Sequence, residues 1–295
     1  MEKIKKRKSK KRTMLILAAV LAVLAVFCAF ALSKRLRVQR YTAVSEKLEA
    51  PVRLAAIADL HSTLYGENQA ELIEAVRQEA PDVVLFVGDI VDDRLPEEPA
   101  RLLFEALGAE FPCYYVTGNH EYRSGRCDAA KAMIAGYGVT VLTGDADLLT
   151  TVNGQTLCIA GVDDPQLWGG YSICGGYDVP AEWLAQLEAC KTAAAKSGAC
   201  SVLLSHRPEL TGAYRDSGFD LVVSGHAHGG QVRIPGLVNG LGLFAPCQGW
   251  FPKYAGGAYA LGGTTLAVSR GLCRNSLPRV FNRPELVIVT LAPEA

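Results

Sequence analysis

The chain has 295 residues, a formal net charge of zero and 49% hydrophobic residues, a composition that excludes an intrinsically disordered chain. The charge is unevenly distributed. The first 40 residues hold 12 Lys and Arg against one acid, whereas the remainder holds 18 basic and 29 acidic residues, a net of −11. A body this acidic would repel a polyphosphate backbone, so we expect no nucleic-acid partner.

An apolar run of 19 residues, from Met14 to Leu32, follows a basic tail. As a helix it would span about 28 Å, enough to cross the hydrocarbon core of a membrane. Eight basic residues precede the run and four follow it. This imbalance predicts a single-pass cell-membrane protein with a cytoplasmic N-terminus and a catalytic domain outside the cytoplasm. A cleaved signal peptide is the alternative, because Ala29-Phe30-Ala31 matches an A-x-A cleavage site.

Four segments follow from this pattern. We expect a cytoplasmic tail (1–12), a membrane anchor or signal peptide (13–32), a polar linker (33–50) and one folded domain (51–295). The last segment holds eight cysteines, and an even number in an exported domain permits disulfides. Several lie in apolar runs, so buried free thiols are an equally good interpretation. They are Cys113, Cys127, Cys158, Cys174, Cys190, Cys200, Cys247 and Cys273.

Behind the linker, short apolar runs of strand length alternate with amphipathic segments. Asn68 is the expected cap of the first helix, and Asn153-Gly154 is a hairpin turn signal. This order predicts an α/β layered domain that antiparallel strands join in its second half. Strands are expected at 52–58, 83–87, 113–116, both halves of 148–160, 201–204, 221–223 and within 259–291, and helices at 69–80, 97–107, 129–136 and 181–196.

All five histidines follow strand-like apolar runs and stand beside Asp, Asn, Gly or another His. Singly, each motif is weak, since a lone His is more often a satisfied core or surface residue than a ligand. Together they predict one shared site, because open α/β sheets bind ligands at the carboxyl ends of their strands. The motifs are Asp59-Leu60-His61, Gly88-Asp89, Gly118-Asn119-His120-Glu121, Ser205-His206 and Gly225-His226-Ala227-His228.

With His120 set apart, the motifs offer two Asp, one Asn and four His. This set of oxygen and nitrogen ligands suits Mn²⁺, Fe²⁺ or Zn²⁺. Seven ligands exceed the protein shell of one ion with an open position, whereas two ions that share a carboxylate would use them all. Paired ions about 3.5–4 Å apart are a recurrent device for phosphoryl transfer. The sequence therefore predicts two divalent metal ions.

In this order the motifs resemble those of the calcineurin-like metallophosphoesterases, over about 170 residues from Asp59 to Gln231. The strings GHAHGGQ (225–231) and VSRGL (268–272) resemble the bacterial membrane-associated branch, which is similar to UDP-2,3-diacylglucosamine pyrophosphatases. The resemblance implies a four-layer α/β/β/α sandwich of two facing mixed sheets.

The resemblance also implies a role for each site residue. Asp59, His61 and His228 would hold one ion, Asn119, His206 and His226 the other, and Asp89 would bridge them. His120 would bind no metal and would protonate the leaving group, with Asp92 orienting its ring. The family often has an Arg where Asp93 stands here, and Arg123 and Arg207 are candidate substitutes, although salt bridges are the simpler interpretation.

We therefore expect a hydrolase in which a hydroxide held between two ions attacks phosphorus in line. The expected substrate is a phosphodiester or pyrophosphate, and the membrane tether favours a lipid or cell-envelope precursor. Two alternatives remain open. A di-iron redox protein lacks its usual Glu-x-x-His pairs here, and a catalytically silent metal-binding module would have little use for His120. Residues 241–254, rich in Gly, Pro and aromatics, are expected to form a loop at the site.

Overall fold

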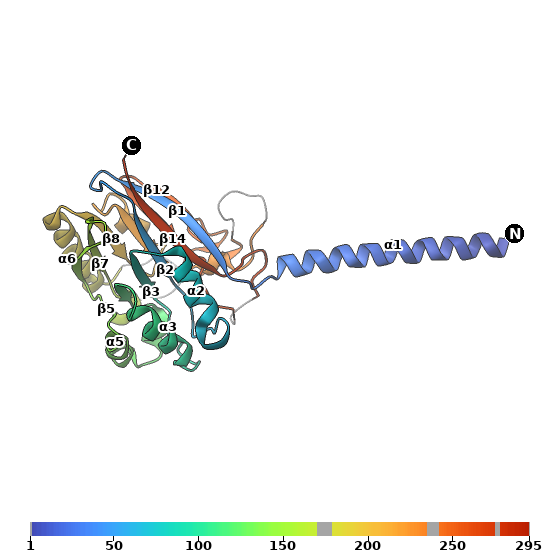
Figure 1. Cartoon of the computed structure of the whole chain (residues 1–295), viewed down its shortest axis with the longest axis horizontal. Coiled ribbons are helices and arrows are strands. Elements are labelled where there is room, and N and C mark those ends of the chain that lie inside the picture. Colours follow the sequence, from blue (N-terminus) through green and yellow to red (C-terminus); the bar gives the residue numbers. More distant parts are fainter. Residues whose placement is uncertain (1, 170–178, 235–241, 275–277, 295) are drawn as a thin grey trace.

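Two six-stranded mixed sheets face each other in the body of the molecule (Figure 1). The computed structural model describes residues 2–169, 179–234, 242–274 and 278–294. In spatial order the first sheet contains β1 (Arg37–Ser45), β14 (Glu285–Pro293), β2 (Val52–Ile57), β3 (Val83–Val87), β4 (Cys113–Val116) and β5 (Thr140–Val141). The second contains β12 (Gly257–Leu261), β13 (Thr264–Val268), β9 (Leu221–Ser224), β8 (Cys200–Leu204), β7 (Thr156–Gly161) and β6 (Asp145–Thr150).

Helices cover the outer face of each sheet. Against the first sheet lie α2 (Ala70–Glu79), α3 (Glu98–Gly108) and α5 (Cys127–Ala135), and against the second lies α6 (Ala181–Ser197). The short helices are α4 (Asn119–Arg123) and α7 (Thr211–Tyr214), with single 3-10 turns η1 (Glu67–Gln69), η2 (Pro165–Trp168) and η3 (His228–Gly230). The result is the expected four-layer α/β/β/α sandwich.

Three apolar layers hold these elements together. Between the sheets, Leu54 and Val87 of the first pack in one cluster with Val202 and Val223 of the second. A second cluster lies under α2 and α3, and a third, which includes Trp183, lies under α6. Strands such as β3 and β8 are buried on both faces, which is why their sequences are continuous apolar runs without alternation.

Strand direction decides where the loops meet. The neighbouring strands β2, β3, β4 and β5 are parallel, and so are β7, β8, β9 and β13. Antiparallel partners lie only outside these runs: β14 beside β2, β6 beside β7 and β12 beside β13. The carboxyl ends of each parallel run therefore open at one edge of its sheet.

Two expectations about local structure are wrong. The segment 33–50 is not simply a linker, because it contains β1, which pairs in parallel with β14 along its whole length. Polar residues on this edge strand hid its alternation. Asn68 does not cap α2: it has a φ of 50° inside η1, and the capping position is Gln69, whose side chain instead bonds the backbone of Tyr65, Thr63 and Pro99.

The N-terminal helix α1 (Glu2–Ala31) extends away from the body (Figure 1). An 18-residue window within its segment Lys10–Ala31 has a mean hydropathy of 3.0, and the segment is long and apolar enough to cross a membrane. Among the described residues, Cys113, Cys158, Cys190, Cys200 and Cys273 are buried thiols. Cys174 lies outside the described residues.

Candidate metal centre

The loops after five strands bring the seven expected metal ligands and His120 to one edge of the sandwich. Asp59 and His61 follow β2, Asp89 follows β3, and Asn119 begins α4 just after β4. From the facing sheet, His206 follows β8, and His226 and His228 follow β9. Two sheets thus contribute to one centre, which is why residues nearly 170 positions apart are neighbours.

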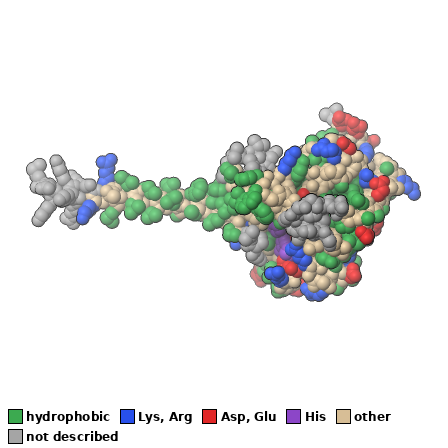
Figure 2. Space-filling model, turned by 180° about the vertical axis from the view of Figure 1, so that it is seen from behind, with side chains coloured by type: hydrophobic (Ala, Val, Ile, Leu, Met, Phe, Trp, Pro, Cys, Tyr) green, Lys and Arg blue, Asp and Glu red, His purple; other side chains and the backbone are tan. Residues whose placement is uncertain are grey.

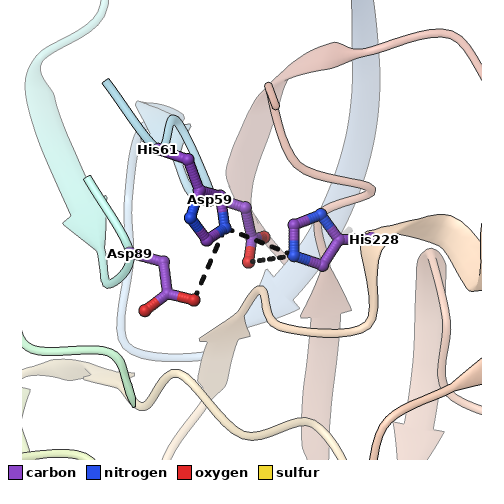
Figure 3. A group of neighbouring side chains, drawn as sticks. All are labelled: Asp59, His61, Asp89 and His228. Carbon is purple, nitrogen blue, oxygen red and sulfur yellow. Dashed lines mark hydrogen bonds and ion pairs between the residues drawn. The ribbon is translucent and has the colours of Figure 1, made fainter. Parts of the chain in front are cut away.

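Asp59, His61, Asp89 and His228 form one group of metal-competent side chains (Figure 3). The ring nitrogen Nε2 of His61 lies 3.3 Å from His228 Nε2 and 3.5 Å from Asp89 Oδ2. His228 Nε2 lies 3.5 Å from Asp59 Oδ1. Asp89, His206 and His226 form a second group, in which His206 Nε2 lies 3.3 Å from Asp89 Oδ2. Asp89 belongs to both groups.

The donor atoms fit metal ions. All seven side chains are buried, yet Asn119 Oδ1 has no hydrogen-bond partner within the described part of the chain. Leaving a buried polar atom without a partner is costly, and a coordinated cation removes that cost. Both Asp59 and Asp89 are essentially inaccessible, so divalent ions would also neutralise their charge.

The buried carboxylates of the site raise the pKa of two of its histidines. Burial would lower the pKa of His206, but the neighbouring Asp89 outweighs it and raises that pKa to about 10. For His61, burial is outweighed by the hydrogen bond to Asp92 and the charge of Asp89, and its pKa rises to about 9. A metal ligand must be an unprotonated imidazole, so an entering ion would displace these protons.

The backbone of the site is strained. Five of the seven expected ligands have a positive φ, between 46° and 62°, although none is glycine: Asp59, His61, Asp89, His226 and His228. Each such residue costs about 1–3 kcal/mol and persists only where the surroundings impose it. Strain concentrated in this way is typical of a functional centre.

Glycines make room for the two carboxylates. A Cβ atom on Gly118 would lie 2.3 Å from Asp89 Oδ1, and one on Gly225 would lie 2.6 Å from Asp59 Oδ2. Gly271 also approaches Asp59 closely, since a Cβ on Gly271 would lie 2.6 Å from the Asp59 Cβ. This contact gives the VSRGL string a physical role, which the motif alone did not reveal.

Glu121 joins the loops that follow β3 and β4. Its fully buried carboxylate accepts hydrogen bonds from the backbone N–H groups of Gly118, Asp89, Ile90 and Val91, at 2.7–3.0 Å. Burial raises its pKa to about 7. The G-N-H-E motif by itself indicates no role for Glu121, because the four N–H groups converge on it only in the folded chain.

The two aspartates after Asp89 have different partners. Asp92 accepts from His61 Nδ1 at 3.1 Å, whereas Asp93 accepts from His120 Nδ1 at 2.9 Å, and Asp92 lies 3.5 Å from the same atom. Asp92 thus lies within ion-pair distance of His120, as expected, but Asp93, which the sequence did not single out for this role, is the closer partner. His120 is 24% exposed and borders a cavity of about 610 Å³ with His61, Arg123, His228 and Gln231.

Arg207 is not available to bind a substrate phosphate. Its side chain is fully buried and makes a two-pronged ion pair with Asp164, at 2.6 and 2.9 Å. A third nitrogen lies 2.8 Å from His226 Nε2 and 3.6 Å from Cys247 Sγ. Glu209, His226 and Cys247 also form a metal-competent group, but the guanidinium already occupies that space with a positive charge. Arg123 is exposed beside the cavity.

Comparison with known proteins assigns this centre to a family. The sequence profile of the calcineurin-like phosphoesterases matches residues 52–230, which include every residue of both metal-competent groups that contain Asp89. The chain belongs to the calcineurin-like phosphoesterase family. It is thus a hydrolase of phosphoric esters, and its Asp and His side chains form a cluster suited to metal ions.

Several relatives of this phosphoesterase match over most of their length. It is 31% identical to an uncharacterised metallophosphoesterase of Aquifex aeolicus, over 87% of this chain and 92% of the relative. The metallophosphoesterase YkuE of Bacillus subtilis is 28% identical, over 81% and 78% of the two chains. The phosphodiesterase YaeI of Escherichia coli is 27% identical, over 82% and 83%.

Proposed function

We propose that this phosphoesterase binds two divalent ions and hydrolyses a phosphodiester or pyrophosphate. The observation that carries the proposal is the position of Asp89, which belongs to two groups of buried metal-competent side chains at once. Asp59, His61 and His228 complete the shell of one ion, and Asn119, His206 and His226 that of the other. Mn²⁺, Fe²⁺ and Zn²⁺ all suit this set of nitrogen and oxygen donors. The similar protein named as a phosphodiesterase supports the choice of ester.

When bound, the ions supply an activated water and neutralise charge on the phosphate. The chain contributes position and a proton. Asp93 holds Nδ1 of His120, so in the protonated ring Nε2–H remains for the departing oxygen. Asp92 accepts a hydrogen bond from His61 Nδ1 and so orients Nε2 of that ring toward the proposed metal ions.

The purified chain should bind close to two transition-metal ions and hydrolyse bis(p-nitrophenyl) phosphate only when they are present. Elemental analysis and a colorimetric assay, with and without added Mn²⁺, measure both quantities. A chain that binds one ion or none after reconstitution would rule out the dinuclear centre. A chain that binds two ions without hydrolysis would instead be a silent binding module, and oxygen consumption by the iron form would indicate redox chemistry.

We also propose that α1 stays attached as a membrane anchor, with the catalytic domain outside the cytoplasm. The charge imbalance around the apolar segment supports this orientation. Protease added to intact wall-less cells should therefore digest the domain that begins at β1. Protection of the domain would reverse the orientation, and a soluble product that begins near Leu32 would identify α1 as a signal peptide.

A further inference from the structure

The strands β10 (Phe244–Ala245) and β11 (Gly249–Trp250) form a short hairpin with an exposed apolar surface. Trp250 is 68% exposed, Phe251 58%, and Leu243 and Phe244 37% each. The rings of Phe244 and Trp250 pack edge to face at 5.6 Å, and Phe251 N donates to Leu243 O at 2.9 Å, so the four exposed residues are neighbours. We call these four residues the apolar hairpin. Exposed apolar patches of this kind mark contact surfaces.

Backbone hydrogen bonds connect the apolar hairpin to the end of α1. Leu243 N donates to Val232 O at 2.8 Å, Val232 pairs with Val280, and Phe281 N donates to Ala31 O at 2.7 Å. The ring of Phe281 also contacts Phe27 and Phe30 of α1. Figure 2 shows hydrophobic side chains gathered where the helix meets the body, with histidine beside them.

The same hairpin borders the metal centre. Leu243 N also donates to Gly230 O at 2.9 Å, and Gly230 ends η3, which begins at His228. Gly230 and Gly242 approach so closely that a Cβ on Gly230 would lie 2.3 Å from the Gly242 Cα. A rigid backbone connection therefore fixes the distance between the metal centre and the apolar hairpin.

Basic side chains surround the C-terminal end of α1. Lys34, Arg35, Arg274 and Arg283 line a cavity of about 670 Å³ in which Glu71 is the one acid among the described lining residues. Arg283 donates to the carbonyl oxygens of Arg35 and Leu36, and Arg274 lies over the ring of Tyr65, so these cations are held in place. Positive charge here contrasts with the acidic body and complements anionic lipid headgroups.

We infer that the apolar hairpin and the four basic residues at the end of α1 lie against the membrane, so that the metal centre takes its phosphoester from membrane lipids. The inference rests on the proposed function and names its substrate class. Aromatic side chains beside cations suit the membrane–water interface. Continuity with the end of α1 favours a bilayer over a second copy of the chain as the occupant of this surface.

The first test uses the full chain in vesicles of phosphatidylcholine and phosphatidylglycerol. Lipids with brominated acyl chains should quench Trp250 fluorescence, and Trp250→Phe should lose that quenching. Trp168→Phe serves as the control and should keep it. Equal quenching in the parent and in Trp250→Phe would show that Trp250 lies outside the bilayer and would overturn the inference.

The second test compares two substrates with the same leaving group: bis(p-nitrophenyl) phosphate in water and phosphatidyl-p-nitrophenol in the vesicles. The triple variant Phe244→Ser/Trp250→Ser/Phe251→Ser should lower vesicle hydrolysis by about tenfold and leave the soluble reaction unchanged. The control, Leu148→Ser/Val152→Ser/Leu184→Ser, removes three exposed apolar residues from β6, the turn after it and α6. Helix α6 lies on the side of the body opposite to α1 (Figure 1). The control should alter neither rate.

The outcomes separate the two proposals. If the parent hydrolyses the soluble ester and the hairpin variant keeps its full vesicle rate, the proposed membrane contact is wrong and the phosphoesterase function stands. If metal-loaded parent hydrolyses neither ester, the proposed function is wrong, and the loss of quenching in Trp250→Phe still decides whether the hairpin enters the membrane. A self-associating chain whose dimers protect Trp250 from the quencher would assign the surface to a second copy.

Discussion

Replacing Asp89 by Asn is expected to remove most of the bound metal and to lower phosphodiester hydrolysis by about 10³-fold. Asp89 is the one carboxylate shared by the two metal-competent groups that we propose as the ion shells. An amide of the same size keeps the packing but removes the negative charge that faces both ions. His228→Ala affects one group only and should therefore lose less metal. Elemental analysis and bis(p-nitrophenyl) phosphate hydrolysis measure the two effects.

Asp128→Asn is the matched control, because Asp128 is exposed on α5 and belongs to no metal-competent group of described residues. It should keep its metal and its activity. Circular dichroism should show that Asp89→Asn remains folded, so that metal loss is not a consequence of unfolding. Retention of two ions and of the parent rate by Asp89→Asn would contradict a bridging role.

Replacing His120 by Asn should leave both ions bound and slow hydrolysis of esters with alkoxide leaving groups by about 10²–10⁴-fold, the range for loss of a positioned acid. A p-nitrophenolate leaving group needs little protonation, so its rate should fall much less. The geometry supports this difference, because His120 is partly exposed at the cavity and is held by Asp93 and not by the metal-competent groups that contain Asp89. Parallel assays on an alkyl and a p-nitrophenyl ester measure it.

The two neighbouring aspartates provide an internal comparison. Asp93→Asn should reproduce the His120→Asn pattern in a milder form, because it only orients the ring. Asp92→Asn should instead weaken metal retention, because Asp92 holds His61. If His120→Asn strips the metal, or if both leaving groups suffer equally, His120 is a ligand or a charge stabiliser and not a general acid.

Most strands of the sandwich could be predicted because their local pattern leaves little choice. A strand buried on both faces must be apolar throughout, and β3 and β4 begin and end at the predicted residues. The candidate site was equally visible, since its Asp, Asn and His residues each follow such a run directly. The predicted Asn153-Gly154 turn likewise joins the antiparallel strands β6 and β7. Local sequence therefore predicts an element wherever the burial or the turn conformation of one segment depends on that segment alone.

Contacts between distant segments were decided only by the tertiary structure. The strand β1 is polar along its exposed edge and becomes recognisable through its pairing with β14, about 250 residues away. Asp92 and Asp93 differ by one position, and only the path of the loop determines which of them reaches His120. Three further contacts also join separate loops: the backbone hydrogen bonds to the Glu121 carboxylate, the ion pair of Arg207 with Asp164 and the contact of Gly271 with Asp59. The sequence by itself therefore predicted which residues gather at the candidate site, whereas the packing of two sheets against each other decided which of these side chains contact one another.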